Sequence, residues 1–236
     1  PLGTGGAIAN CREHLSGGTF CVINGDLITS IRVEEMLVFH TSNGGIATIS
    51  LWEVEDPSRF GVADYIDETG KIMRFQEKPP IEDAFSNLIN AGTYLLEHDI
   101  FDLMPEGAHS IERDVYEKIA ASGALNGFPF GGMFVDAGTP TSFVEASQAC
   151  ISSHRFSSGS VQDDSWLGSD SHCLGRVSGS SIGPGATIAE GCNVRNSVIL
   201  EGAVIEGNCL LESCLIGKGA TIPAGTVMSG EIVNHI

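Results

Sequence analysis

Ile182-Gly183-Pro184-Gly185-Ala186-Thr187 is followed directly by Ile188-Ala189-Glu190-Gly191-Cys192-Asn193 and then by Val194. One aliphatic residue therefore opens each block of six, and small or polar residues fill the rest. The pattern slips by one residue near Ser197 and resumes at Ile199, Ile205, Leu210, Ile216 and Ile222. Hexapeptide repeats are typical of a parallel β-helix, whereas aliphatic residues at a fixed period do not suit a solvated Gly-rich linker. We expect a left-handed β-helix of about three to four coils, whose aliphatic side chains stack in a prism-shaped core.

Upstream of the repeats the sequence changes character. Residues 152–170 are polar and rich in Ser and Gly, which indicates a linker. Before the linker, helical spacing over 31–43 and a β-rich run over 46–54 precede a hairpin signature at 67–70. This alternation predicts an α/β domain. We expect a Rossmann-like domain over residues 1–151, a linker over 152–165 and the β-helix over 166–236.

Two apolar runs in the first part end in an aspartate. Phe20-Cys21-Val22-Ile23 leads into Asn24-Gly25-Asp26, which predicts a buried parallel strand, and ligands of open α/β sheets bind beyond the carboxyl ends of strands. A strand-like run over 128–135 leads into Asp136-Ala137-Gly138-Thr139-Pro140. Carboxylates suit Mg2+, so Asp26 and Asp136 could converge on one cation. The alternative is an ordinary turn, because Asn and Gly tolerate positive φ and Asp caps helices.

Three other stretches could contact a ligand. Gly3-Thr4-Gly5-Gly6 precedes a predicted helix over 7–15, where free N–H groups would suit a phosphate or a base edge; a plain loop is the alternative. Glu77-Lys78 could bind hydroxyls and a phosphate, or form a surface ion pair of little energetic worth. A strand over 87–96 contains Asn90 and Gly92, and Gly92 would allow close approach to the backbone. A helix is expected over 111–121.

The composition restricts the partners. A net charge of −18 leaves no basic surface for nucleic acid, so a phosphorylated ligand would need local cations or a metal. The seven Cys residues are scattered without a CxxC pair, which favours reduced thiols in a cytoplasmic protein. No apolar run approaches the roughly 20 residues of a membrane span, so no membrane partner is expected.

Six stretches together resemble the sugar-nucleotide pyrophosphorylases, a family of nucleotidyltransferases, and most of all the bacterial mannose-1-phosphate guanylyltransferases. Each motif alone is weak, but all six occur in the family's order and are followed by a β-helix tail similar to that of many members. The matching stretches are Leu2-Gly3-Thr4-Gly5-Gly6-Ala7, Val22-Ile23-Asn24-Gly25-Asp26, Phe75-Gln76-Glu77-Lys78-Pro79, Asn87-Leu88-Ile89-Asn90-Ala91-Gly92, Ser110-Ile111-Glu112-Arg113-Asp114-Val115 and Asp136-Ala137-Gly138-Thr139-Pro140.

The resemblance implies a reaction and a set of residue roles. The reaction is nucleotidyl transfer from a nucleoside triphosphate, here GTP, to a hexose 1-phosphate, here mannose 1-phosphate, with Mg2+ as cofactor and pyrophosphate as product. The implied catalytic residues are Asp26, Lys78 and Asp136, of which Asp26 and Asp136 would bind the metal. The implied ligand contacts are Gly3, Thr4, Gly6, Asn24 and Gly25 for the nucleotide, and Glu77, Lys78, Asn90 and Gly92 for the sugar phosphate.

The chain also departs from the family. Members begin with a strand, a Gly-Gly-x-Gly-Thr-Arg-Leu loop that wraps the triphosphate and then a Pro-Lys pair, none of which precedes Pro1. We expect a truncated and by itself inactive enzyme sequence, or else a non-catalytic, sugar-nucleotide-binding regulatory subunit.

Other functions stay open at this point. Thymidylyl or adenylyl transfer to glucose 1-phosphate and assembly into a homo-oligomer both remain alternatives. A hexapeptide acyltransferase would need a catalytic His between coils, whereas only His172 and His235 lie near the repeats, at their two ends.

Overall fold

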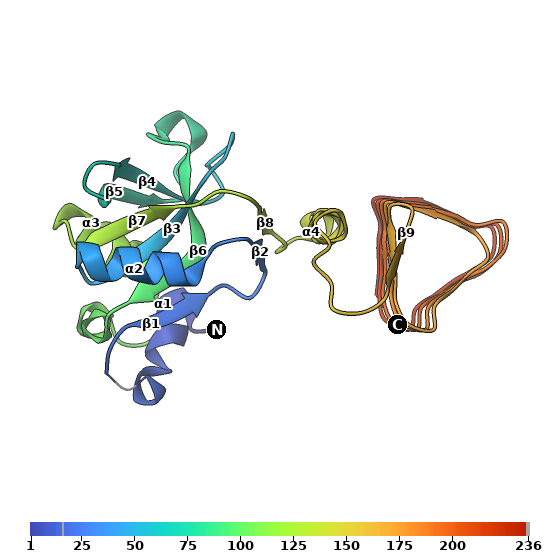
Figure 1. Ribbon diagram of the computed structural model, residues 1–236, viewed down its shortest axis with the longest axis horizontal. Helices are drawn as coiled ribbons and strands as arrows, with labels where there is room; N and C mark the ends of the chain where they lie inside the picture. The colour runs from blue at the N-terminus through green and yellow to red at the C-terminus, as the bar shows by residue number, and fades with distance from the viewer. Residues whose placement is uncertain (16, 235–236) are drawn as a thin grey trace. The chain divides into compact units, whose positions relative to one another are not determined.

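The computed structural model describes residues 1–15 and 17–234 and divides into two compact units, Pro1–Phe134 and Val135–Ile236 (Figure 1). The domain boundaries expected from the sequence, at 151, 152–165 and 166, stay a prediction. Within the described ranges, no helix combines the length and the apolar character that crossing a bilayer demands.

The first unit is built on a six-stranded mixed sheet with the strand order β1-β6-β3-β7-β5-β4. Only β3 and β7 run parallel to each other, and the remaining neighbours pair antiparallel. The hairpin expected around residues 67–70 is confirmed by β4 and β5. The strands are β1 (Phe20–Ile23), β3 (Ala47–Glu53), β4 (Gly61–Ile66), β5 (Lys71–Glu77), β6 (Leu88–Leu96) and β7 (Leu125–Pro129).

Strand β1 differs from its prediction. It pairs antiparallel with β6 and is the edge strand of the described sheet. Phe20 and Val22 pack on the core, whereas Cys21 and Ile23 are exposed. The prediction of a buried parallel strand is therefore wrong, because an apolar run fixes neither the neighbour of a strand nor its place in the sheet.

Helices cover the sheet of the first unit. Helix α2 packs against β3 and β7, as Figure 1 shows, and ends at Asn43, before Gly44, whose φ of +60° favours glycine. The helix expected over 111–121 is present but contains a wide π turn. The helical segments are α1 (Gly3–Ala9), α2 (Val33–Asn43), α3 (Glu117–Ala121), the π turn Glu112–Tyr116 and the 3-10 turns Arg12–His14, Ile81–Asp83 and His98–Leu103.

Two sequence-based boundaries are wrong. The helix predicted over 7–15 begins at Gly3 and gives way to a 3-10 turn after Ala9. The single strand predicted over 128–135 is split into β7 and β8 (Phe134–Asp136). Between them the chain leaves the sheet, because the Met133 carbonyl accepts the Ser30 N–H at 2.9 Å and Gly132 has a φ of +106°.

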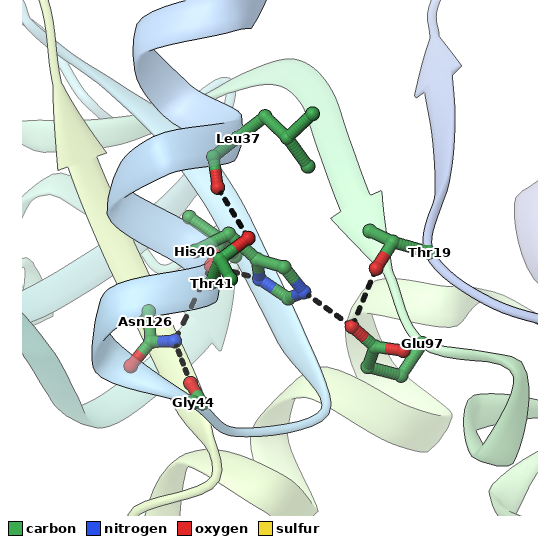
Figure 2. Close-up of polar contacts among 8 residues, drawn as sticks. Thr19, Leu37, His40, Thr41, Gly44, Glu97 and Asn126 are labelled. Atoms are coloured by element: carbon green, nitrogen blue, oxygen red, sulfur yellow. Dashed lines mark hydrogen bonds and ion pairs between the residues drawn. The ribbon is translucent and has the colours of Figure 1, made fainter.

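A buried polar network joins α2 to the sheet (Figure 2). The ring of His40, 2 % exposed, contacts Thr48 Oγ1 through Nδ1 at 2.6 Å and Glu97 Oε1 through Nε2 at 2.9 Å. Thr19 Oγ1 donates to the same Glu97 oxygen at 2.7 Å, and Asn126 Nδ2 donates to Thr48 Oγ1 at 3.3 Å. The hydrogen bond from Thr19, followed by that from His40, holds the pKa of Glu97 below its ordinary value. The network satisfies polar groups that the core would otherwise leave unpaired.

Replacing Thr48 with Val should show how much this network contributes to the free energy of unfolding. The substitution keeps the shape of the side chain but leaves the buried ring of His40 without a partner at Nδ1. We expect the free energy of unfolding to fall by about 1–3 kcal/mol. Chemical denaturation measures this, and Thr41→Val, which removes only a hydroxyl bonded to the Leu37 carbonyl on exposed helix surface, is the matched control. Equal effects of the two substitutions would contradict the assignment.

The second unit contains α4 (Pro140–Ser152), which is followed by a parallel β-helix. Thr139 caps α4, because its side chain accepts the Ser142 N–H and the Ser142 hydroxyl bonds back to Thr139. Figure 1 shows the coils stacked with a triangular outline. The strands are β9 (Ser160–Gln162), β10 (Ser165–Leu167), β11 (His172–Cys173), β12 (Arg176–Ser178), β13 (Ser181–Ile182), β14 (Thr187–Ile188), β15 (Asn193–Arg195), β16 (Val198–Ile199), β17 (Val204–Ile205), β18 (Leu210–Glu212), β19 (Leu215–Ile216), β20 (Thr221–Ile222), β21 (Val227–Ser229) and β22 (Ile232–Val233).

The strands form three sheets, and their register explains the slip in the repeat. Val194 pairs with Leu211 and Leu211 pairs with Met228, so each of these coils takes 17 residues. Three hexapeptides would take 18 residues, so one of the three sides of each coil is one residue shorter than a hexapeptide. The expected core is confirmed at Ile188 and Ile205 but is wrong at Leu210, which is 47 % exposed while Leu211 fills the core position.

The short side of each coil turns through a left-handed residue. Gly179, Asn196, Ser213 and Gly230 occupy equivalent corners, with φ values of +55°, +45°, +53° and +68°. Ser tolerates this conformation less well than Gly or Asn. Ser213→Asn should therefore raise the free energy of unfolding by about 0.5 kcal/mol, measured by thermal or urea unfolding. Ser229→Asn, in strand β21, should bring no such gain, and a loss of stability in Ser213→Asn would contradict the expectation.

Candidate functional site

The Gly-rich segment at the start of the chain is already engaged by the protein. Gly3-Thr4-Gly5-Gly6 forms the first turn of α1, and the N–H groups of Gly5 and Gly6 both donate to the His109 carbonyl, at 3.1 and 3.3 Å. A Cβ on Gly5 would come within 2.3 Å of His109 Cδ2. The expected free N–H groups are therefore not free at Gly5 and Gly6, and the segment is held against residues 107–109.

Three of the predicted residues come together beyond the end of β1. The Asn24 N–H donates to the Gly92 carbonyl at 2.9 Å. The Gly92 N–H donates to Asn90 Oδ1 at 3.0 Å, and Asn90 Nδ2 donates to Tyr94 Oη at 3.1 Å. Gly92 has a φ of +68°, and a Cβ there would lie 2.7 Å from Asn24 Nδ2. The close approach expected at Gly92 is thus made by the side chain of Asn24.

Glu77 and Lys78 have different environments at the end of β5. The Glu77 side chain is 13 % exposed and that of Lys78 is 58 % exposed, with 3.9 Å between Glu77 Oε1 and Lys78 Nζ. The backbone fixes both residues, because the Glu77 N–H donates to Glu117 Oε1 and the Lys78 N–H donates to the Phe60 carbonyl. The pair is therefore not a simple surface ion pair. It presents a shielded carboxylate beside a solvated ammonium group.

The pKa of Glu77 is raised above its ordinary value. Burial is the main cause, and the negative charge of Glu112 adds to it, while Lys78 and Arg113 act in the opposite direction and Glu117 contributes a smaller rise. A carboxylate that is partly desolvated and surrounded by other carboxylates gains from hydrogen-bond donors. This environment suits a ligand that carries hydroxyl groups.

Glu112 belongs to this cluster, although no role was predicted for it. It is 7 % exposed at the start of the π turn, and its Oε2 accepts from Thr4 Oγ1 and from Ser110 Oγ, both at 2.6 Å. Its charge also contributes to the raised pKa values of the buried Tyr94 and Tyr116, for which burial is the main cause. The only sequence signal was its place within the motif Ser110–Val115.

The two aspartates expected to bind a metal belong to different units. Asp26 is exposed in the turn between β1 and β2 (Leu27–Thr29), beside the open position of Gly25. Asp136 ends β8, and its Oδ1 accepts the Gly138 N–H at 2.9 Å. Their convergence on one cation stays a prediction. Among the described residues, no group of three or more His, Cys, Asp or Glu side chains gathers as a metal cage would.

The acyltransferase alternative gains nothing from the β-helix. His172 opens β11 and is exposed, and His235 lies outside the described residues.

Comparison with known proteins identifies both parts of the chain. The family model of nucleotidyl transferases matches residues 1–153, and the model of GlmU-like C-terminal hexapeptide regions matches residues 145–232. Mannose-1-phosphate guanylyltransferase 1 of Arabidopsis thaliana is 35 % identical over 212 residues, which cover 85 % of this chain and 57 % of the relative. The catalytic subunit beta of mannose-1-phosphate guanylyltransferase of Dictyostelium discoideum is 38 % identical over 145 residues, covering 61 % of this chain and 40 % of the relative.

A solved structure resembles the fold as well. It is a Bacillus anthracis protein assigned as a glucose-1-phosphate thymidylyltransferase, in complex with sucrose, with a TM-score of 0.56 and 27 % identity. The match covers 67 % of this chain and 63 % of that protein. The match spans 57 % of the length of the Arabidopsis relative and 40 % of the length of the Dictyostelium relative. Because the family model spans more than half of the chain, from the Gly-rich first turn to the end of α4, the chain belongs to the nucleotidyl transferase family.

Proposed function

We propose that this chain carries the nucleotide- and hexose-recognising part of an enzyme that transfers a guanylyl group from GTP to mannose 1-phosphate and releases pyrophosphate. The observation that carries the proposal is the joined set of Asn24, Asn90 and Gly92 in a chain of this family, together with the shielded carboxylate of Glu77, whose charge acts on the same Tyr94 hydroxyl that Asn24 and Asn90 contact. The guanylyl and mannosyl specificity rests on the names of the relatives, such as those from Arabidopsis and Dictyostelium.

In this proposal the ligand contacts divide between two sides of the cluster. On the nucleotide side are Gly3, Thr4, Gly6, Asn24 and Gly25. On the sugar-phosphate side, Glu77 accepts hydrogen bonds from hexose hydroxyls, and Asn90 and Gly92 line the hexose. Lys78 is more than half exposed, so its ammonium group can reach an anionic phosphate beside the shielded carboxylate.

A divalent metal is used generally in this family, and we propose Mg2+. The exposed carboxylate of Asp26 fits such an ion, because Mg2+ is usually held by one or two carboxylates together with waters and substrate phosphates. Asp136 stays the second carboxylate that the family resemblance implies. When bound, the ion neutralises charge on the phosphate oxygens.

The chain's own residues would then position the reactants for direct displacement. Lys78 orients the 1-phosphate, whose oxygen attacks the α-phosphorus of the triphosphate while the bond to pyrophosphate breaks. No covalent enzyme intermediate is required, because such transfers depend on positioning and charge neutralisation. Glu77 and Asn90 fix the hexose so that its phosphate points toward the nucleotide.

A second candidate, thymidylyl transfer to glucose 1-phosphate, is favoured by the structural similarity to the Bacillus anthracis protein. Pyrophosphate release decides between the two. GTP, dTTP and ATP are each combined with mannose 1-phosphate or glucose 1-phosphate in the presence of Mg2+. Highest turnover with GTP and mannose 1-phosphate supports the proposal, and highest turnover with dTTP and glucose 1-phosphate would overturn it. In the complete protein, nucleotide-sugar binding without turnover would indicate the regulatory-subunit alternative.

Other features of the whole protein are proposals of the same kind. We place it in the cytoplasm, without nucleic-acid or membrane partners. The Dictyostelium relative is named as a catalytic subunit, so assembly with like or unlike subunits is the expected setting. Size measurement by light scattering tests the homo-oligomer.

A further inference from the structure

Glu112 links two chain segments that are more than a hundred residues apart. Its Oε2 accepts the hydroxyl protons of Thr4 and Ser110, both at 2.6 Å, and Thr4 Oγ1 in turn accepts the Ile111 N–H at 3.1 Å. Hydrogen bonds to a carboxylate are shorter and stronger than those between neutral groups. Because Glu112 is buried, water competes little for these bonds.

The same contacts fix the first turn of α1. The His109 carbonyl accepts the N–H groups of Gly5 and Gly6, and the His109 N–H donates to the Leu2 carbonyl at 2.9 Å. A Cβ on Gly3 would lie 2.4 Å from the His109 carbonyl oxygen. Of the contacts described here, the hydrogen bond from Thr4 to Glu112 connects this turn to a charged side chain. Its loss would loosen the turn on the nucleotide side of the site.

The π turn that begins at Glu112 packs against β5, the strand that ends at Glu77, and the Glu77 N–H donates to Glu117 Oε1 at 3.0 Å. The charge of Glu112 therefore also acts on the hexose side. After burial, it is the largest cause of the raised pKa of Glu77, and the other charged groups that act on Glu77 are Lys78, Arg113 and Glu117. Tyr116 Oη is buried in the same region without a hydrogen-bond partner, and Glu112 raises the pKa of that phenol too. The Glu112 carboxylate therefore acts on the nucleotide side through its hydrogen bond with Thr4, and on the hexose side through the effect of its negative charge on Glu77.

We propose that Glu112 is a positioning residue that couples the two sides of the site, because its carboxylate holds the turn Gly3–Gly6 through Thr4 and interacts as a neighbouring charge with Glu77. This inference rests on the proposed function. Glu112 itself contacts neither substrate. Occupation of the nucleotide side should strengthen binding on the hexose side through this residue, and the coupling should disappear when either of its two interactions is removed.

Two variants separate the two interactions. Glu112→Gln keeps an oxygen that can accept from Thr4 and Ser110 but removes the charge, whereas Thr4→Val removes the hydroxyl and keeps the charge. Thr4→Ser retains the hydroxyl and should restore the behaviour of the wild type. Thr41→Val and Glu68→Gln, both at exposed positions, are matched controls for loss of a hydroxyl and of a carboxylate.

The experiment combines a ligand-free and a ligand-bound readout on the full chain. Carbon NMR of the Glu77 carboxyl group without ligand should show its titration midpoint moving to lower pH in Glu112→Gln and staying in place in Glu68→Gln. Calorimetry with GDP, GDP-mannose and mannose 1-phosphate, the last with and without saturating GDP, should show that GDP strengthens mannose 1-phosphate binding in the wild type by roughly 3- to 10-fold, about 0.7–1.4 kcal/mol. This gain should be lost in Thr4→Val and in Glu112→Gln and should return in Thr4→Ser.

The outcomes are distinct. An unchanged Glu77 midpoint in Glu112→Gln, or a GDP-dependent gain in mannose 1-phosphate affinity that persists in Thr4→Val, would overturn the coupling while leaving the proposed function intact. If the midpoint shifts but the wild type binds none of the three ligands, the proposed function fails, and the coupling of ligand sites fails with it. Both expected shifts together support the inference.

Discussion

Asp26→Asn is expected to lower the rate of pyrophosphate release, in the enzyme that contains this chain, by at least about 100-fold while leaving the fold intact. Asn keeps the size of the side chain but removes the charge that attracts a divalent cation. The side chain is exposed in the turn after β1, so its replacement should leave the core unchanged. The rate with GTP and mannose 1-phosphate is measured at several Mg2+ concentrations, and the affinity for GDP-mannose is measured with and without Mg2+.

The control for Asp26 is Asp99→Asn, another exposed aspartate in the 3-10 turn His98–Leu103. It should behave as the wild type does in both measurements. A variant at Asp26 that turns over normally, or that retains the full effect of Mg2+ on affinity, would show that this carboxylate does not hold the metal.

Glu77→Gln is expected to weaken the binding of mannose 1-phosphate by about 10- to 100-fold. A shielded carboxylate accepts hydrogen bonds from hydroxyls more strongly than an amide does. In addition, the NH2 group of Gln cannot accept the hydrogen bond that a hydroxyl donates. Calorimetric titration measures the affinity. Glu68→Gln, in the turn between β4 and β5, should leave it unchanged.

The raised pKa of Glu77 adds a dependence on pH. As the pH falls, the accepting carboxylate form disappears at a higher pH than an ordinary Glu would allow, because burial and then Glu112 raise its pKa. Hexose binding should weaken over that range in the wild type, and this acid limb should be missing in Glu77→Gln. The folded state binds this proton more tightly than the unfolded chain does, so the penalty of the buried charge on stability is present above the raised pKa and fades as the pH falls through it. An acid limb that persists in Glu77→Gln would assign the titration to another group.

The β-helix was predictable because its signal is local and repeated. Each aliphatic residue, such as Ile188 or Ile205, opens a short block whose turns carry small residues, and no long-range information is needed to see it. The error at Leu210 has a local cause as well. Each coil has one side of five residues, here between Leu211 and Ile216, so counting back by six from Ile216 points to Leu210, the residue before the true core position.

The α/β part was predictable in its elements but less so in their arrangement. The strands β3 and β6 and the hairpin β4–β5 follow from alternation and turn residues. The edge position of β1 is set by pairing with β6, about seventy residues further along the chain, which no local pattern encodes. The early start of α1 likewise depends on His109, because its carbonyl accepts the N–H groups of Gly5 and Gly6.

The residues of the candidate site divide in the same way, into those that a local motif predicts and one that depends on a distant partner. Glu77, Lys78 and Asn24 stand at the ends of strands, and Asn90 lies within β6. All four belong to recognisable motifs, so their residue types and positions pointed to ligand contacts. Glu112 was missed as a participant because its contacts with Thr4 join residues 108 positions apart. Polar residues whose effect depends on a distant partner become visible only when the fold brings that partner close.

The central claim is that this chain holds a nucleotide-sugar site, and calorimetric titration with GDP-mannose, dTDP-glucose and ADP-glucose, with and without Mg2+, tests it most directly. The account predicts saturable binding that is tightest for GDP-mannose and is strengthened by Mg2+. Absence of binding to all three nucleotide sugars, in a sample whose circular dichroism and cooperative unfolding show that it is folded, would contradict it.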